Sequence, residues 1–132
     1  MIDAIWVPTS VHFLVGTLVL LASLAALAAA GYHGFRNRPP TRWAHGLFIL
    51  AQLTLAVQAL IGIKLLDQGL GPLQLYIHYV GGLGPLLFYL VYYWAPEPLR
   101  ARRWSATLVT GAALSFALMA YFIGQSYDPT AH

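Results

Sequence analysis

Four long apolar stretches, separated by short connections, constrain this chain more than any other feature. They run approximately over residues 9–33, 42–66, 72–95 and 104–126. An α-helix rises about 1.5 Å per residue, so about 20 apolar residues cross a hydrocarbon core of about 30 Å. Each stretch meets that requirement, and together they use most of the 132 residues. The sequence therefore predicts a single domain, residues 1–132, built from four transmembrane helices.

The composition also indicates an integral membrane protein. Apolar residues make up 59% of the chain and charged residues 8%, whereas soluble domains carry about 25% charged residues. Cysteine is absent, which excludes disulfides, c-type haem attachment and iron–sulfur ligation. No carboxylate lies inside a span, so the proton coupling of small four-helix exporters is not expected. No nucleophile–base pair, phosphate loop or HExxH motif suggests a hydrolase or NTPase.

The basic residues predict the orientation. Most of the seven Lys and Arg residues lie in two short connections, at 34–41 and 95–103, and such residues favour the cytoplasmic side. Two spans separate these connections, so both fall on one face of the membrane. We expect an up-down-up-down four-helix bundle with the N-terminus and the C-terminus outside. The positive charge is explained by topology, and no nucleic-acid partner is expected.

Small and polar residues predict which faces point inward, because each span is apolar nearly all round. In the first span the predicted inward residues are His12, Gly16, Val19, Ser23, Ala26 and Ala30. In the fourth span they are Gly111, Ser115, Met119 and Phe122.

Two histidines are the main functional candidates, because a titratable imidazole inside a span is costly unless it is used. His12 lies near the start of the first span, and His78 lies about two turns into the third. Both are expected at a similar depth near the outer face, on diagonally opposed helices. That placement suits two axial ligands of one haem iron. Gly16 and Gly82, each four residues further on, share the histidine face and leave room for a porphyrin.

Structural explanations remain open beside this interpretation. His12 also fits an interfacial histidine, and the glycines around Gly82 also fit a close helix crossing. Gln58 lies near the depth of His78, where it would either bond across helices or touch a haem or a quinone. His33 and His45 flank the first basic connection. They fit a second metal or haem site or a quinone contact, although contact with lipid phosphates is the simpler reading.

Four short-looped spans with paired histidines resemble the four-helix haem-binding membrane proteins, namely the cytochrome b561 type and one half of haem A synthase. The resemblance rests on His12, His78 and to a lesser degree His45. It implies haem b as the cofactor, with a quinone as a further candidate. Residues 104–126 contain no histidine and residues 42–66 no glutamate. The resemblance therefore implies haem binding but not the synthase reaction.

These observations predict a cytochrome b-like electron-transfer subunit of a bacterial or archaeal plasma membrane. It would hold haem b through His12 and His78 and would exchange electrons with a quinone, with other membrane redox subunits or within a homodimer. No catalytic residue is predicted. Two alternatives remain: a cofactor-free accessory subunit of a respiratory or photosynthetic complex, and a small transporter. Iron or copper, and one haem or two, also remain open.

Overall fold

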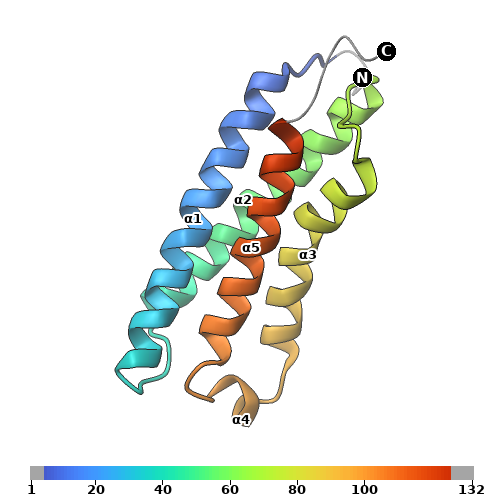
Figure 1. Cartoon of the computed structure of the whole chain (residues 1–132). Helices are drawn as coiled ribbons and strands as arrows, with labels where there is room; N and C mark the ends of the chain where they lie inside the picture. The colour runs from blue at the N-terminus through green and yellow to red at the C-terminus, as the bar shows by residue number, and fades with distance from the viewer. Residues whose placement is uncertain (1–4, 126–132) are drawn as a thin grey trace.

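The computed structural model describes residues 5–125, and this part of the chain is all-α (Figure 1). The long helices are α1 (Thr9–Phe35), α2 (Arg42–Asp67), α3 (Leu75–Trp94) and α5 (Ser105–Gln125), and a single turn, α4 (Glu97–Arg100), lies between the last two. Each long helix has the length and the apolar composition needed to cross a membrane. The prediction of an all-α protein with four candidate spans is confirmed. The short helix α4 was not predicted.

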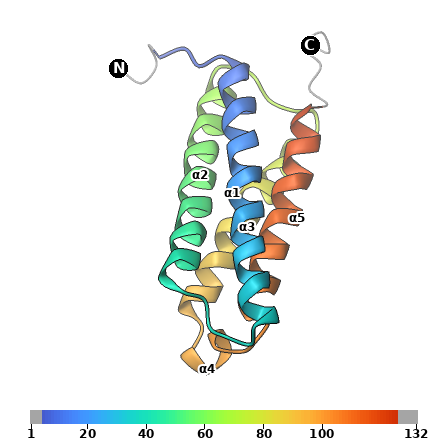
Figure 2. The same ribbon diagram turned by 90° about the vertical axis from the view of Figure 1, so that its left-hand side faces the viewer.

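The four long helices run alternately up and down (Figures 1 and 2). α1 packs against α2 and α5, and α3 packs against the same two helices, so α1 and α3 occupy opposite corners of the bundle. The start of α1, the α2–α3 connection and the end of α5 share one end, called the upper end below. The α1–α2 and α3–α5 connections, which hold residues 36–41 and 95–104, form the basic end.

The residues at the helix limits explain where each helix stops. After α1, Asn37 adopts a positive φ of 50°, and two prolines follow that cannot continue a helix. After α2, Gly69 has a φ of 77° and donates its N–H to the carbonyl of Leu66 at 2.9 Å. Glycine adopts this left-handed conformation without strain. α3 begins at Leu75 rather than at the predicted residue 72, because the chain first turns at residues 73–74.

Small side chains fill the centre of the bundle. The buried residues of α1 are Gly16, Val19, Ala22, Ser23, Ala26, Ala30 and Gly34. They confirm the predicted inward face, and the half-buried His12 lines a cavity between the helices. The buried residues of α5 are Ala106, Thr110, Ala113, Ala117 and Ala120. The inward face predicted for this helix is wrong at Ser115 and Phe122, which are exposed, whereas the other two predicted residues, Gly111 and Met119, are half-buried. The Ser115 hydroxyl donates to the Gly111 carbonyl at 2.9 Å, so its own helix satisfies it.

α3 and α5 approach each other closely at two glycines of α3. A Cβ atom at Gly81 would lie 2.9 Å from the Phe116 carbonyl oxygen, and one at Gly84 would lie 2.8 Å from the Phe116 ring. Only a residue without a side chain permits this approach. Both glycines therefore serve a helix crossing. Gly82 differs, because a Cβ atom there would have nothing within 4 Å.

Candidate functional site

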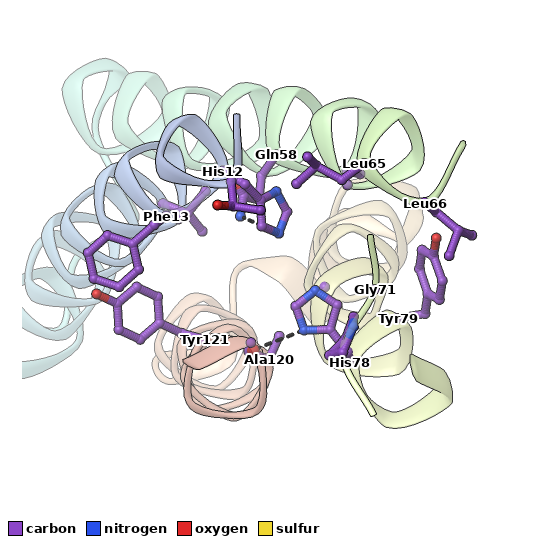
Figure 3. A pocket seen from close by; sticks show the side chains of 18 of the residues that line it. His12, Phe13, Gln58, Leu65, Leu66, Gly71, His78, Tyr79, Ala120 and Tyr121 are labelled. Carbon is purple, nitrogen blue, oxygen red and sulfur yellow. Dashed lines mark hydrogen bonds between the residues drawn. The ribbon is translucent and has the colours of Figure 1, made fainter. Parts of the chain in front are cut away.

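A cavity of about 500 Å³ lies in the upper half of the bundle and is lined by all four long helices (Figure 3). Ligand sites usually have volumes of about 300–1,000 Å³. The lining is mostly apolar and includes Leu55, Leu65 and Leu83. It also includes all five residues predicted for a cofactor site: His12, Gly16, Gln58, His78 and Gly82.

The imidazole rings of His12 and His78 face each other across this cavity (Figure 3). Their centroids are 5.9 Å apart, and the ring planes are inclined by 53°. A metal–imidazole bond is about 2.0 Å long, so an ion bound between two such rings would hold their centres roughly 6 Å apart. The two side chains thus come from opposite corners of the bundle to a spacing that one metal ion would bridge.

His78 is held by α5. Its Nδ1 lies 2.9 Å from the carbonyl oxygen of Ala120. A carbonyl oxygen only accepts, so Nδ1 carries the proton and donates it, and Nε2 keeps its lone pair. Ligating histidines nearly always donate their second ring N–H in this way. Gly124, one turn after Ala120, leaves room for the ring, since a Cβ atom there would lie 3.3 Å from Cε1 of His78.

His12 is held by α2 in a different way. Its Nε2 lies 3.2 Å from Nε2 of Gln58. Nδ1 of His12 and Oε1 of Gln58 are buried and have no hydrogen-bond partner among the described residues. Gly62 leaves room for the ring, since a Cβ atom there would lie 3.2 Å from Cε1 of His12. A Cβ atom at Gly16 would lie 3.1 Å from Nε2 of Gln58 and 3.5 Å from the ring of Tyr121, so this glycine leaves room for both side chains.

Two glycines of the site, Gly62 and Gly124, were missed by sequence reasoning. Gly62 of α2 faces His12 of α1, and Gly124 of α5 faces His78 of α3. Each pair of packed helices, α1–α2 and α3–α5, thus places a glycine of one helix against the histidine of the other. The signal was present as a glycine near the upper end of both α2 and α5. It was not specific, because glycine has many uses in transmembrane helices.

Polar contacts tie down the upper end, next to the cavity. The side-chain amide of Gln68 accepts from the backbone N–H of Val7 at 2.8 Å and donates to its carbonyl at 2.9 Å. Lys64 pairs with Asp67 at 2.6 Å. On the other side of the cavity the hydroxyls of Thr17 and Tyr121 are 3.2 Å apart. The two hydrogen bonds between Gln68 and Val7 attach the segment before α1 to the α2–α3 connection.

His33 and His45 lie away from the cavity, toward the basic end. Nε2 of His33 is 3.3 Å from the hydroxyl of Thr41, and Nδ1 of His45 is 3.0 Å from the hydroxyl of Tyr93. Within residues 5–125, no group of three or more His, Cys, Asp or Glu side chains is arranged to hold a metal ion. The contacts with Thr41 and Tyr93 give each of these two histidines a separate protein partner.

No family model, curated protein or solved structure matches this chain. What the structure shows is the architecture alone, an antiparallel bundle of four apolar helices that could span a membrane. Because architecture alone does not specify function, the function has to be inferred from the chemistry of the cavity.

Proposed function

We propose that this protein is a membrane cytochrome b-like electron carrier, in which His12 and His78 are the axial ligands of one haem b. The observation that supports this most is the pair of imidazole rings 5.9 Å apart on diagonally opposed helices. A planar macrocycle needs ligands that approach from opposite faces, and two side chains from opposite corners of the bundle meet this requirement. The cavity of about 500 Å³ around the rings supports the same proposal.

The individual residues have distinct roles under this proposal. Nε2 of His78 is the free nitrogen, since Nδ1 is engaged with Ala120. Gly82 keeps the α3 backbone beside the cavity free of a side chain. The apolar lining buries the group and limits the access of water, which influences its redox potential. The haem, when bound, supplies one-electron redox chemistry.

The bilayer is the expected environment, and the expected electron partner is a quinone or another membrane redox subunit. The proposal assigns no catalytic residue to the chain. In residues 5–125 the charged groups near the cavity are Lys64 and Asp67, which pair with each other at 2.6 Å. An electron-transfer role needs no proton donor inside the spans, which agrees with this distribution of charge.

The test is the spectrum and the metal content of the full chain, produced in cells supplied with a haem precursor and purified in detergent. We expect reduced-minus-oxidised Soret and α bands, a pyridine haemochrome of the b type and iron rather than copper. His78→Ala should remove these bands. His33→Ala is the matched control and should retain them, because His33 lies outside the cavity and bonds to Thr41.

A folded wild-type protein without these bands would overturn the proposal. Size-exclusion chromatography and far-UV circular dichroism would establish that each variant is folded. A colourless folded protein would favour the cofactor-free accessory subunit instead.

A further inference from the structure

The two histidines at the cavity are held in unequal ways (Figure 3). His78 donates from Nδ1 to a backbone carbonyl at 2.9 Å, which leaves Nε2 available to a metal. His12 has the reverse arrangement. Its Nε2 is in contact with the Gln58 amide at 3.2 Å, while its Nδ1 is buried without a partner among the described residues.

Both orientations of the Gln58 amide occupy the same nitrogen of His12. In one orientation the amide N–H donates to the lone pair of Nε2. In the other, Oε1 accepts a proton from Nε2, which then has no lone pair. A metal bound to Nε2 of His12 must therefore displace Gln58. At His78 nothing has to be displaced.

The surroundings strengthen this difference. A ligating histidine is normally fixed by a hydrogen bond from its second ring nitrogen. His78 has such a bond from Nδ1, whereas in His12 the nitrogen without a partner is the buried Nδ1, and Nε2 is the one in contact with Gln58. Gly16 provides the space in which the Gln58 amide lies, since a Cβ atom there would come within 3.1 Å of it. The contact between Gln58 and His12 is thus built into the packing of α1 against α2.

We infer that His78 would hold the haem iron permanently, whereas Gln58 would compete with the iron for His12 and would so leave the iron accessible to a small diatomic ligand. This inference rests on the proposed haem function. A His12 side chain that left the iron would regain the contact of its Nε2 with Gln58 at 3.2 Å, so its release would not leave Nε2 buried without a partner. The site would therefore bind carbon monoxide, unlike a site with two equally fixed histidines.

The test is a carbon monoxide titration of the reduced, full-length haem protein in detergent, followed by its Soret band. The wild type should bind carbon monoxide. Gln58→Leu removes the competitor, so His12 should stay on the iron and the apparent dissociation constant for carbon monoxide should rise about tenfold. Tenfold corresponds to about 1.4 kcal/mol, the size of one hydrogen bond.

Gln52→Leu is the matched control. Gln52 lies on the same helix and donates to the Phe48 carbonyl of that helix at 3.1 Å, and it does not line the cavity. It should leave the titration unchanged. An unchanged titration in Gln58→Leu as well would overturn the role given to Gln58.

The histidine variants separate the inference from the function on which it rests. His12→Ala should keep haem in a five-coordinate, high-spin form that binds carbon monoxide, while His78→Ala should lose it. Haem in a six-coordinate wild type that does not react with carbon monoxide would overturn this inference and leave the proposed function standing. Equal loss of haem from His12→Ala and His78→Ala would likewise overturn this inference and leave the proposed function standing. A folded wild type without haem would overturn both.

Discussion

Replacing Gly81 with alanine should force α3 and α5 apart at the level of the cavity. The new Cβ atom would lie 2.9 Å from the carbonyl oxygen of Phe116, 2.9 Å from Cβ of Ala120 and 3.0 Å from its backbone nitrogen. Two of these neighbours are backbone atoms of α5 and cannot rotate away. To move from 2.9 Å to an ordinary contact of at least 3.4 Å, the helices have to separate locally.

The expected cost comes from overpacking, which is typically about 1–3 kcal/mol. Gly82→Ala is the matched control, because it is the next residue of the same helix and its Cβ atom would have nothing within 4 Å. Any gain in helix propensity, up to about 1 kcal/mol, is common to both variants. The free energy of unfolding should therefore be about 1–3 kcal/mol lower in Gly81→Ala than in Gly82→Ala, which is roughly 5- to 150-fold in the unfolding equilibrium constant.

The assay is unfolding of the full chain in mixed micelles by titration with SDS, followed by circular dichroism. A second readout follows from the geometry, because the hydrogen bond of 2.9 Å between His78 and the Ala120 carbonyl spans the same crossing. Gly81→Ala should therefore also retain less haem than the wild type. Equal stability of the two variants, within about 0.5 kcal/mol, would refute the close crossing.

Three further substitutions test other contacts. The hydroxyl of Ser23 is buried without a partner among the described residues, so Ser23→Ala should leave stability unchanged or raise it by about 1 kcal/mol in the same SDS titration. Nε of Arg103 donates to the Gly34 carbonyl at 2.8 Å in the last turn of α1, so Arg103→Ala should cost about 1 kcal/mol. Gln68→Ala removes two hydrogen bonds to Val7 and should speed hydrogen exchange of the Val7 amide, as measured by NMR, with little change in the helices.

The opposite results would also be informative. A clear loss of stability in Ser23→Ala would mean that this hydroxyl bonds to another helix. Full stability of Arg103→Ala would mean that the end of α1 does not depend on the second basic connection. If the Val7 amide stayed protected from hydrogen exchange in Gln68→Ala, contacts other than those with Gln68 would hold the segment before α1.

The four helices and their alternating directions follow from the amino-acid sequence without any knowledge of the packing. Inside a bilayer the backbone can satisfy its hydrogen bonds only within the chain, so an apolar run of sufficient length becomes a helix whatever its neighbours are. Short connections then make successive helices antiparallel. Because depth follows from position along a helix, the sequence also indicated that His12 and His78 lie near one level, and their rings are 5.9 Å apart.

The rotation of each helix and the contacts of each polar atom depend on how the helices pack together. Lipid is as apolar as the bundle interior, so an apolar helix carries little information about its inward face. For this reason the face predicted for α5 through Ser115 and Phe122 is wrong. The contact of Gln58 with His12, and that of Ala120 with His78, join residues 46 and 42 positions apart. Such contacts depend on the rotation and register of two packed helices, which no local pattern specifies.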